Sequence, residues 1–68
     1  MERWAGRIYL VNEHTGEERA VYVSTKAAPS APFAEIHDDL LETAQVVSKS
    51  WGGGAWQYQG DDIREISR

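Results

Sequence analysis

The chain has 68 residues, no cysteine and a net charge of −4. This length fits a single compact α+β domain over residues 1–68, and the lack of thiols excludes disulfides and cysteine-ligated zinc. No apolar run approaches the roughly 18 residues of a membrane span, and no secretory signal is visible, so a cytoplasmic protein is expected.

The excess negative charge is concentrated in the middle of the chain. Residues 1–26 contain four basic and four acidic side chains, whereas residues 27–60 contain four acids and one base, Lys49. Such a surface repels phosphate backbones and anionic lipids. It attracts basic protein surfaces instead.

A β-hairpin is expected at the start of the chain. Residues 4–11 and 19–26 have the composition of strands, and Gly16 between them can adopt the positive φ of a four-residue loop. If Asn12 lies opposite Glu17, one register places apolar side chains of both strands on a single face. These core residues are Trp4, Ile8, Val21 and Val23.

An amphipathic helix is expected over residues 33–47. Ser30 is its expected N-cap, Pro32 suits the first turn, and the glycines at 52–54 end it near residues 48–50. The apolar side consists of Phe33, Ile36, Leu40, Ala44 and Val47. The opposite side consists of Glu35, Asp38, Asp39 and Glu42, with no Lys or Arg between them. Like charges at this spacing cost an isolated helix about 0.2–0.5 kcal/mol a pair.

In the last third of the chain, apolar and polar residues alternate only weakly. Residues 55–59 are expected to form a third strand and residues 60–62 a turn, while residues 63–68 fit a short fourth strand or a helical turn. The predicted fold is α+β with element order β-β-α-β-(β). A single antiparallel sheet of three or four strands packs one face on the helix, and Trp56 or Tyr58 completes the core.

The acidic helix side is either a solvated surface or a docking site. A row of carboxylates on a rigid helix imitates a nucleic-acid backbone and competes for the Lys and Arg side chains that contact phosphates. In size and acidity the chain is similar to phage-encoded inhibitors, including anti-CRISPR proteins. The leading hypothesis is a non-enzymatic protein that blocks or modulates a basic, nucleic-acid-handling protein. Its predicted contact residues are Glu35, Asp38, Asp39, Glu42, Asp61 and Asp62.

The other face of the hairpin is the alternative partner-binding surface. It carries Arg7, Tyr9 and Tyr22, which suit ordinary cross-strand pairing, protein contact and base stacking. Two further hypotheses follow: a self-associating structural or accessory domain, for example a homodimer, and a weak binder of single-stranded nucleic acid. Direct nucleic-acid binding is not expected, because the chain is acidic and this patch holds only one or two positive charges.

No catalytic or metal-binding set can be assembled from the sequence. His14 is expected in a solvated turn, and His37 on a half-buried helix side where one helix cannot complete a metal site. The glycines at 52–54 lack the Lys-Ser/Thr of a phosphate-binding loop, and Asp61–Asp62 lacks a nucleophile and an oxyanion donor. We therefore predict no enzymatic activity, no cofactor and no metal.

Overall fold

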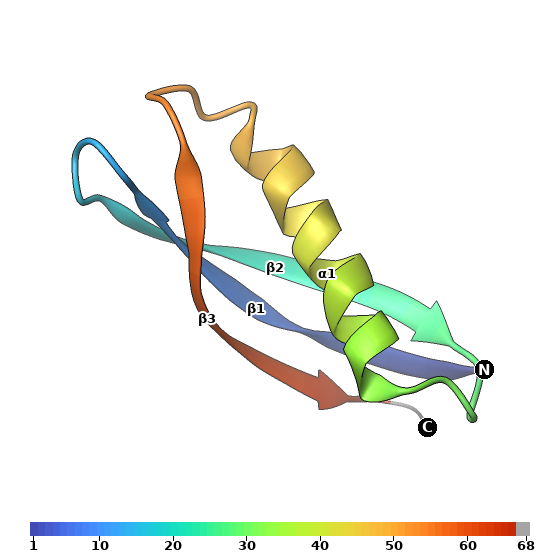
Figure 1. Cartoon of the computed structure of the whole chain (residues 1–68). Helices are drawn as coiled ribbons and strands as arrows, with labels where there is room; N and C mark the ends of the chain where they lie inside the picture. Colours follow the sequence, from blue (N-terminus) through green and yellow to red (C-terminus); the bar gives the residue numbers. More distant parts are fainter. Residues whose placement is uncertain (67–68) are drawn as a thin grey trace.

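The computed structural model describes residues 1–66, which form one antiparallel sheet and one helix (Figure 1). Strand β1 (Glu2–Asn12) is central. It pairs with β2 (Glu18–Ala27) on one side and with β3 (Trp56–Glu65) on the other. Helix α1 (Phe33–Ser48) crosses one face of this sheet and leaves the other face uncovered. The predicted α+β architecture is confirmed.

The hairpin has the predicted register. Ile8 pairs with Val21 and Gly6 with Val23, and the Asn12 N–H donates to Glu17 O over 2.8 Å. Gly16 has φ of 76°, in the left-handed region that favours glycine, and its N–H donates to Asn12 O. Alternating apolar side chains and the conformational demand of one loop glycine together determine this part of the fold.

The core lies between α1 and the inner face of β1 and β2. Its fully buried side chains are Ile8, Leu10 and Leu40, surrounded by Val21, Val23, Ile36 and Ala44. The predicted apolar side of the helix is wrong at both ends, because Phe33 is 50% exposed and Val47 is 38% exposed. The buried row follows an i, i+4 spacing from Ile36 through Leu40 and Ala44 to Ser48, whose hydroxyl donates to Gln45 O. Trp56, one of the two residues predicted to complete the core, packs at its edge.

The expected turn at residues 60–62 is wrong, because β3 runs without interruption from Trp56 to Glu65. A bulge replaces the turn: Tyr9 pairs with Gly60 and Leu10 with Tyr58, which leaves Gln59 without a partner on β1. Residues 63–65 thus continue the third strand and form no separate element. The part of the predicted last element at residues 67–68 lies outside the described residues.

The expected N-cap at Ser30 is also wrong. Pro32 is the residue before the helix, with φ of −67° and ψ of 146°, and its carbonyl accepts the first helical hydrogen bonds from Glu35 and Ile36. The fixed φ of proline lets the chain enter the helix directly from an extended residue. Ser30 therefore lies two residues too early to cap, in a turn where the Ala31 N–H donates to Ala28 O.

Asn12 links the hairpin loop to the glycine-rich loop before β3. Its side chain is buried, with 2% of the residue exposed. The Oδ1 atom accepts the N–H groups of His14 and Thr15 at 2.8 and 3.0 Å, and Nδ2 donates to Gly53 O at 2.9 Å. One amide thereby fixes two loops that are far apart in the sequence.

Within residues 1–66, no helix combines the length and the apolarity needed to cross a lipid bilayer.

Candidate functional site

The four carboxylates of α1 form a surface that we call the acidic ridge: Glu35, Asp38, Asp39 and Glu42. All four residues are exposed: Glu35, Asp38 and Glu42 lie on the side of α1 turned away from the buried row that contacts the sheet, and Asp39 lies on the flank beside β2. Among the described residues, none of the four forms an ion pair with Lys, Arg or His within 4.0 Å. The ridge thus presents its negative charge to solvent.

One carboxylate of the ridge is tethered to the sheet. The Thr25 hydroxyl of β2 donates to Asp39 Oδ2 over 2.6 Å. This bond leaves the charge of Asp39 in place and holds its side chain beside β2. Glu35, Asp38 and Glu42 have no side-chain hydrogen bond within the described part of the chain, so their carboxylates can accept bonds from a partner.

Asp61 and Asp62, which were predicted to extend this row, lie elsewhere. Asp61 is on the inner face of β3 and contacts His37, on the flank of α1, with Nε2 and Oδ2 2.7 Å apart. Asp62 is the next residue along the strand, so its side chain points to the opposite face, where it pairs with Arg64 Nε at 3.4 Å. The fold therefore does not bring either side chain into the acidic ridge.

The bulge explains how Asp61 acquires its partners. Without it, Tyr58 and Asp61 would point to opposite faces, since they are three positions apart in a strand. With Gln59 unpaired, both side chains face the helix, and the Tyr58 hydroxyl donates to the same Oδ2 that His37 contacts. The three residues link α1 to β3 and are only partly shielded from solvent.

The hydrogen bonds of this cluster shift two titrations. The bond from Tyr58, and secondarily that from His37, lowers the pKa of the Asp61 carboxyl below its usual value, against the opposing effect of desolvation. The same bond to Asp61 raises the pKa of Tyr58. The His37 ring also packs edge-on against Tyr58 at 5.7 Å and near Phe33, which contacts Trp4. These contacts join the helix to β3. No cluster of three metal-ligating side chains occurs in residues 1–66.

The uncovered face of the sheet carries most of the positive charge. Strand alternation places Arg3 and Arg7 of β1 there, and pairing places Lys26 beside Arg3 and Arg64 beside Ala5. We call this surface the basic sheet face; its cations are Arg3, Arg7, Lys26 and Arg64. The predicted alternative surface is part of it, because Tyr22 lies opposite Arg7 and is 69% exposed, with Tyr9 next along β1 and half-buried.

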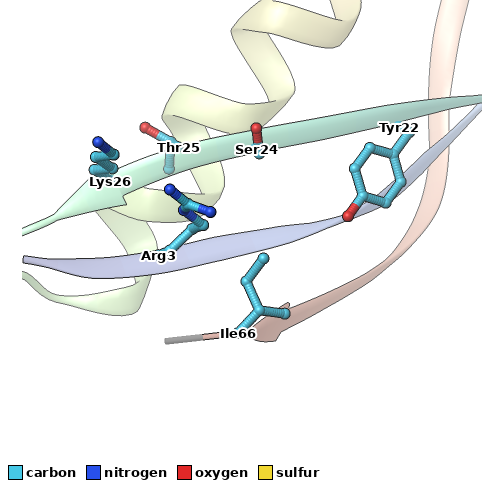
Figure 2. Close-up of a pocket in the computed structure, with 6 residues that line it drawn as sticks. All are labelled: Arg3, Tyr22, Ser24, Thr25, Lys26 and Ile66. Atoms are coloured by element: carbon cyan, nitrogen blue, oxygen red, sulfur yellow. The ribbon is translucent and has the colours of Figure 1, made fainter. Parts of the chain in front are cut away.

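The basic sheet face is hollowed in its middle. A shallow pocket of about 440 Å³ lies among Arg3, Tyr22, Ser24, Lys26 and Ile66, and Figure 2 shows these side chains along its rim. A second depression of about 200 Å³ continues past Ala5 to Arg7 and Arg64. Small side chains cause the hollow, since Ala5 and Ser24 are neighbours on β1 and β2.

The sequence contained part of this arrangement. The hairpin register predicted from the sequence already places Lys26 next to Arg3 on the outer face. Arg64 could not be placed, because the strand that carries it was expected to end at residue 59.

Comparisons with models of protein families, with curated proteins and with solved structures found no match to this chain.

Proposed function

We propose that this protein is a non-enzymatic interaction protein whose acidic ridge docks onto a basic surface of a nucleic-acid-handling protein and blocks or modulates it. One observation carries the proposal. Four exposed carboxylates lie on one helix side with no cationic partner among the described residues. Their mutual repulsion opposes helix formation and only Asp39 bonds to the rest of the fold, so a role outside the fold accounts best for Glu35, Asp38 and Glu42.

The geometry of the ridge suits a groove that normally holds a phosphate backbone. Its first and last carboxylates are seven positions apart, about 10 Å along a helix axis, so several negative charges fall within a short rigid segment. A rigid helix loses little conformational freedom on binding. Val46 is 60% exposed one turn beyond Glu42 on the same side, and it adds an apolar contact to a charged surface.

The remaining polar groups support binding rather than catalysis. The hydrogen bonds of His37, Asp61 and Tyr58 join the helix to the sheet, and Asn12 joins two loops. A likeness in size and acidity to small phage-encoded inhibitors, including anti-CRISPR proteins, suggests that docking blocks the partner's access to nucleic acid. Such competition is electrostatic and therefore depends on salt.

The test is a charge reversal on the ridge with a matched control. Asp38→Lys with Glu42→Lys changes the net charge from −4 to 0, and Glu13→Lys with Glu18→Lys makes the same change at exposed hairpin positions. Both double variants are expected to fold, because all four side chains are exposed and none of them forms a hydrogen bond or ion pair within the described residues. Proteins from cells that make this chain are captured on wild type and on each variant, and the affinity of each captured protein is then measured.

The proposal predicts a basic protein that binds wild type and the hairpin variant but not the ridge variant. Its affinity should fall steeply between low and physiological salt, as expected for partly exposed ion pairs. Equal binding of all three proteins at low salt would contradict docking through the ridge. Equal loss in both double variants would show that net charge, and not the ridge, controls binding.

A further inference from the structure

We propose that the basic sheet face binds single-stranded nucleic acid, with phosphates on its four cations and a base stacked on Tyr22. This inference does not rest on the acidic ridge, which belongs to the helix rather than to the sheet. It departs from the expectation drawn from the sequence, which counted only one or two positive charges in this patch, because the structure places Arg64 beside Arg3, Arg7 and Lys26 of the hairpin.

The cations surround the hollow. Lys26 and Arg3 are paired neighbours at one end, and Arg64 and Arg7 flank the other side. Among the described residues, neither Lys26 nor Arg7 has an acidic partner within 4.0 Å, and Arg64 has only the long 3.4 Å contact to Asp62 at an exposed position. An exposed pair of this kind is weak, so a phosphate can replace the carboxylate as the partner of Arg64.

The hollow fits a base better than it fits a second sheet or helix. Tyr22 and Ile66, 69% and 45% exposed, both line the pocket and leave apolar surface open to a ligand (Figure 2). An exposed aromatic ring among cations is the combination that single-strand binders use, because rings stack on any base and cations follow the backbone. Its volume of about 440 Å³ is large enough for a nucleotide unit.

The acidic net charge opposes this binding mainly near Lys26, which shares a depression with Glu35 and Asp39 at the edge of β2. Asp38 and Glu42 lie on the helix, and physiological salt screens charges beyond about 8 Å. Two acids share the face: Asp62 contacts Arg64, and Glu18 lies near the hairpin end opposite Val11. The same cluster of cations would repel its copy, which disfavours pairing of two chains through these faces.

The experiment measures binding of a labelled oligothymidylate of about eight nucleotides by fluorescence anisotropy. With four phosphate contacts on a single strand, affinity should fall roughly 50-fold between about 50 and 200 mM salt. Tyr22→Thr removes the ring but introduces a β-branched residue that also favours a strand, and it should weaken binding roughly 5- to 150-fold, whereas Tyr22→Phe should retain it. Arg7→Gln should flatten the salt dependence, and the matched change Lys49→Gln on the helix should not.

Three outcomes would overturn the proposal: no binding at low salt, equal binding by Tyr22→Thr and wild type with the fold of both verified by circular dichroism, or tighter binding of an oligoglutamate or of duplex DNA than of the single strand. The ridge reversal Asp38→Lys with Glu42→Lys separates the two proposals. It should leave oligonucleotide binding in place and abolish docking of the protein partner, so either function can fail alone.

Discussion

Replacing Asn12 with alanine should uncouple the two loops at one end of the sheet. The variant removes two bonds that hold the hairpin loop and one that holds Gly53. At roughly 0.5–1.5 kcal/mol for each bond, the expected loss is about 2–4 kcal/mol in the free energy of unfolding. A domain of 68 residues has roughly 3–10 kcal/mol in total, so the variant should be marginally folded.

The assay is urea unfolding followed by circular dichroism and by tryptophan fluorescence. Trp56 reports on the glycine-rich loop directly, because its Nε1 donates to Gly52 O over 3.0 Å and its ring packs on Trp51. Thr15→Ala is the control in the same loop, since it removes only an exposed bond to the Glu17 N–H and should cost less than about 1 kcal/mol. If Asn12→Ala is no more destabilising than this control, the bridging role of Asn12 is refuted.

Four further predictions concern the fold. Leu40→Ala should cost roughly 2–5 kcal/mol by calorimetry or urea unfolding, because Leu40 is fully buried; a near-native melting temperature would contradict its place in the core. Gly16→Val should cost about 1–2 kcal/mol through its φ of 76° alone, since nothing lies within 4 Å of an added Cβ. Gly6→Ala should destabilise for the opposite reason, by roughly 1–3 kcal/mol, because its Cβ would lie 2.0 Å from a backbone oxygen of β3; an unchanged midpoint would show that the strands separate freely. Because the pKa of Asp61 is lowered in the folded protein, its ionised carboxylate stabilises the fold above about pH 4. This stabilisation is lost as the pH falls through the folded-state pKa. Asp61→Asn should therefore flatten the acid limb of a stability profile, and an identical limb would refute the link.

The hairpin was predictable because several constraints on it agree. Alternating apolar residues, a loop glycine and one register each lead to the same pairing, and the observed partners match from Trp4 to Val11. The helix was predictable in extent for a similar reason, and its end at Ser48 falls where three glycines follow shortly afterwards. Its contact side was predicted less well, since a set that includes Phe33 and Val47 is as apolar as the true row.

The third strand was not predictable in the same way. Gly60, Asp61 and Asp62 are residue types that favour turns, and nothing local indicates that Tyr9 will pair across the bulge. That pairing is a tertiary effect, set by the long edge that β1 offers. The two candidate surfaces differ in the same way. The acidic ridge was predictable because it is a local helical pattern, whereas the basic sheet face could be recognised in full only once all three strands were placed.

The central position of β1 determines the order in which the sheet can form. Its pairing with β2 closes a short loop, whereas its pairing with β3 joins residues more than forty positions apart, at an entropic cost about 2 kcal/mol greater. During synthesis the hairpin and helix leave the ribosome first, and one edge of β1 has no partner until β3 follows. Folding of this chain should therefore be limited by docking of its last strand, and a nascent chain that ends in the glycine-rich loop should present an open strand edge to chaperones.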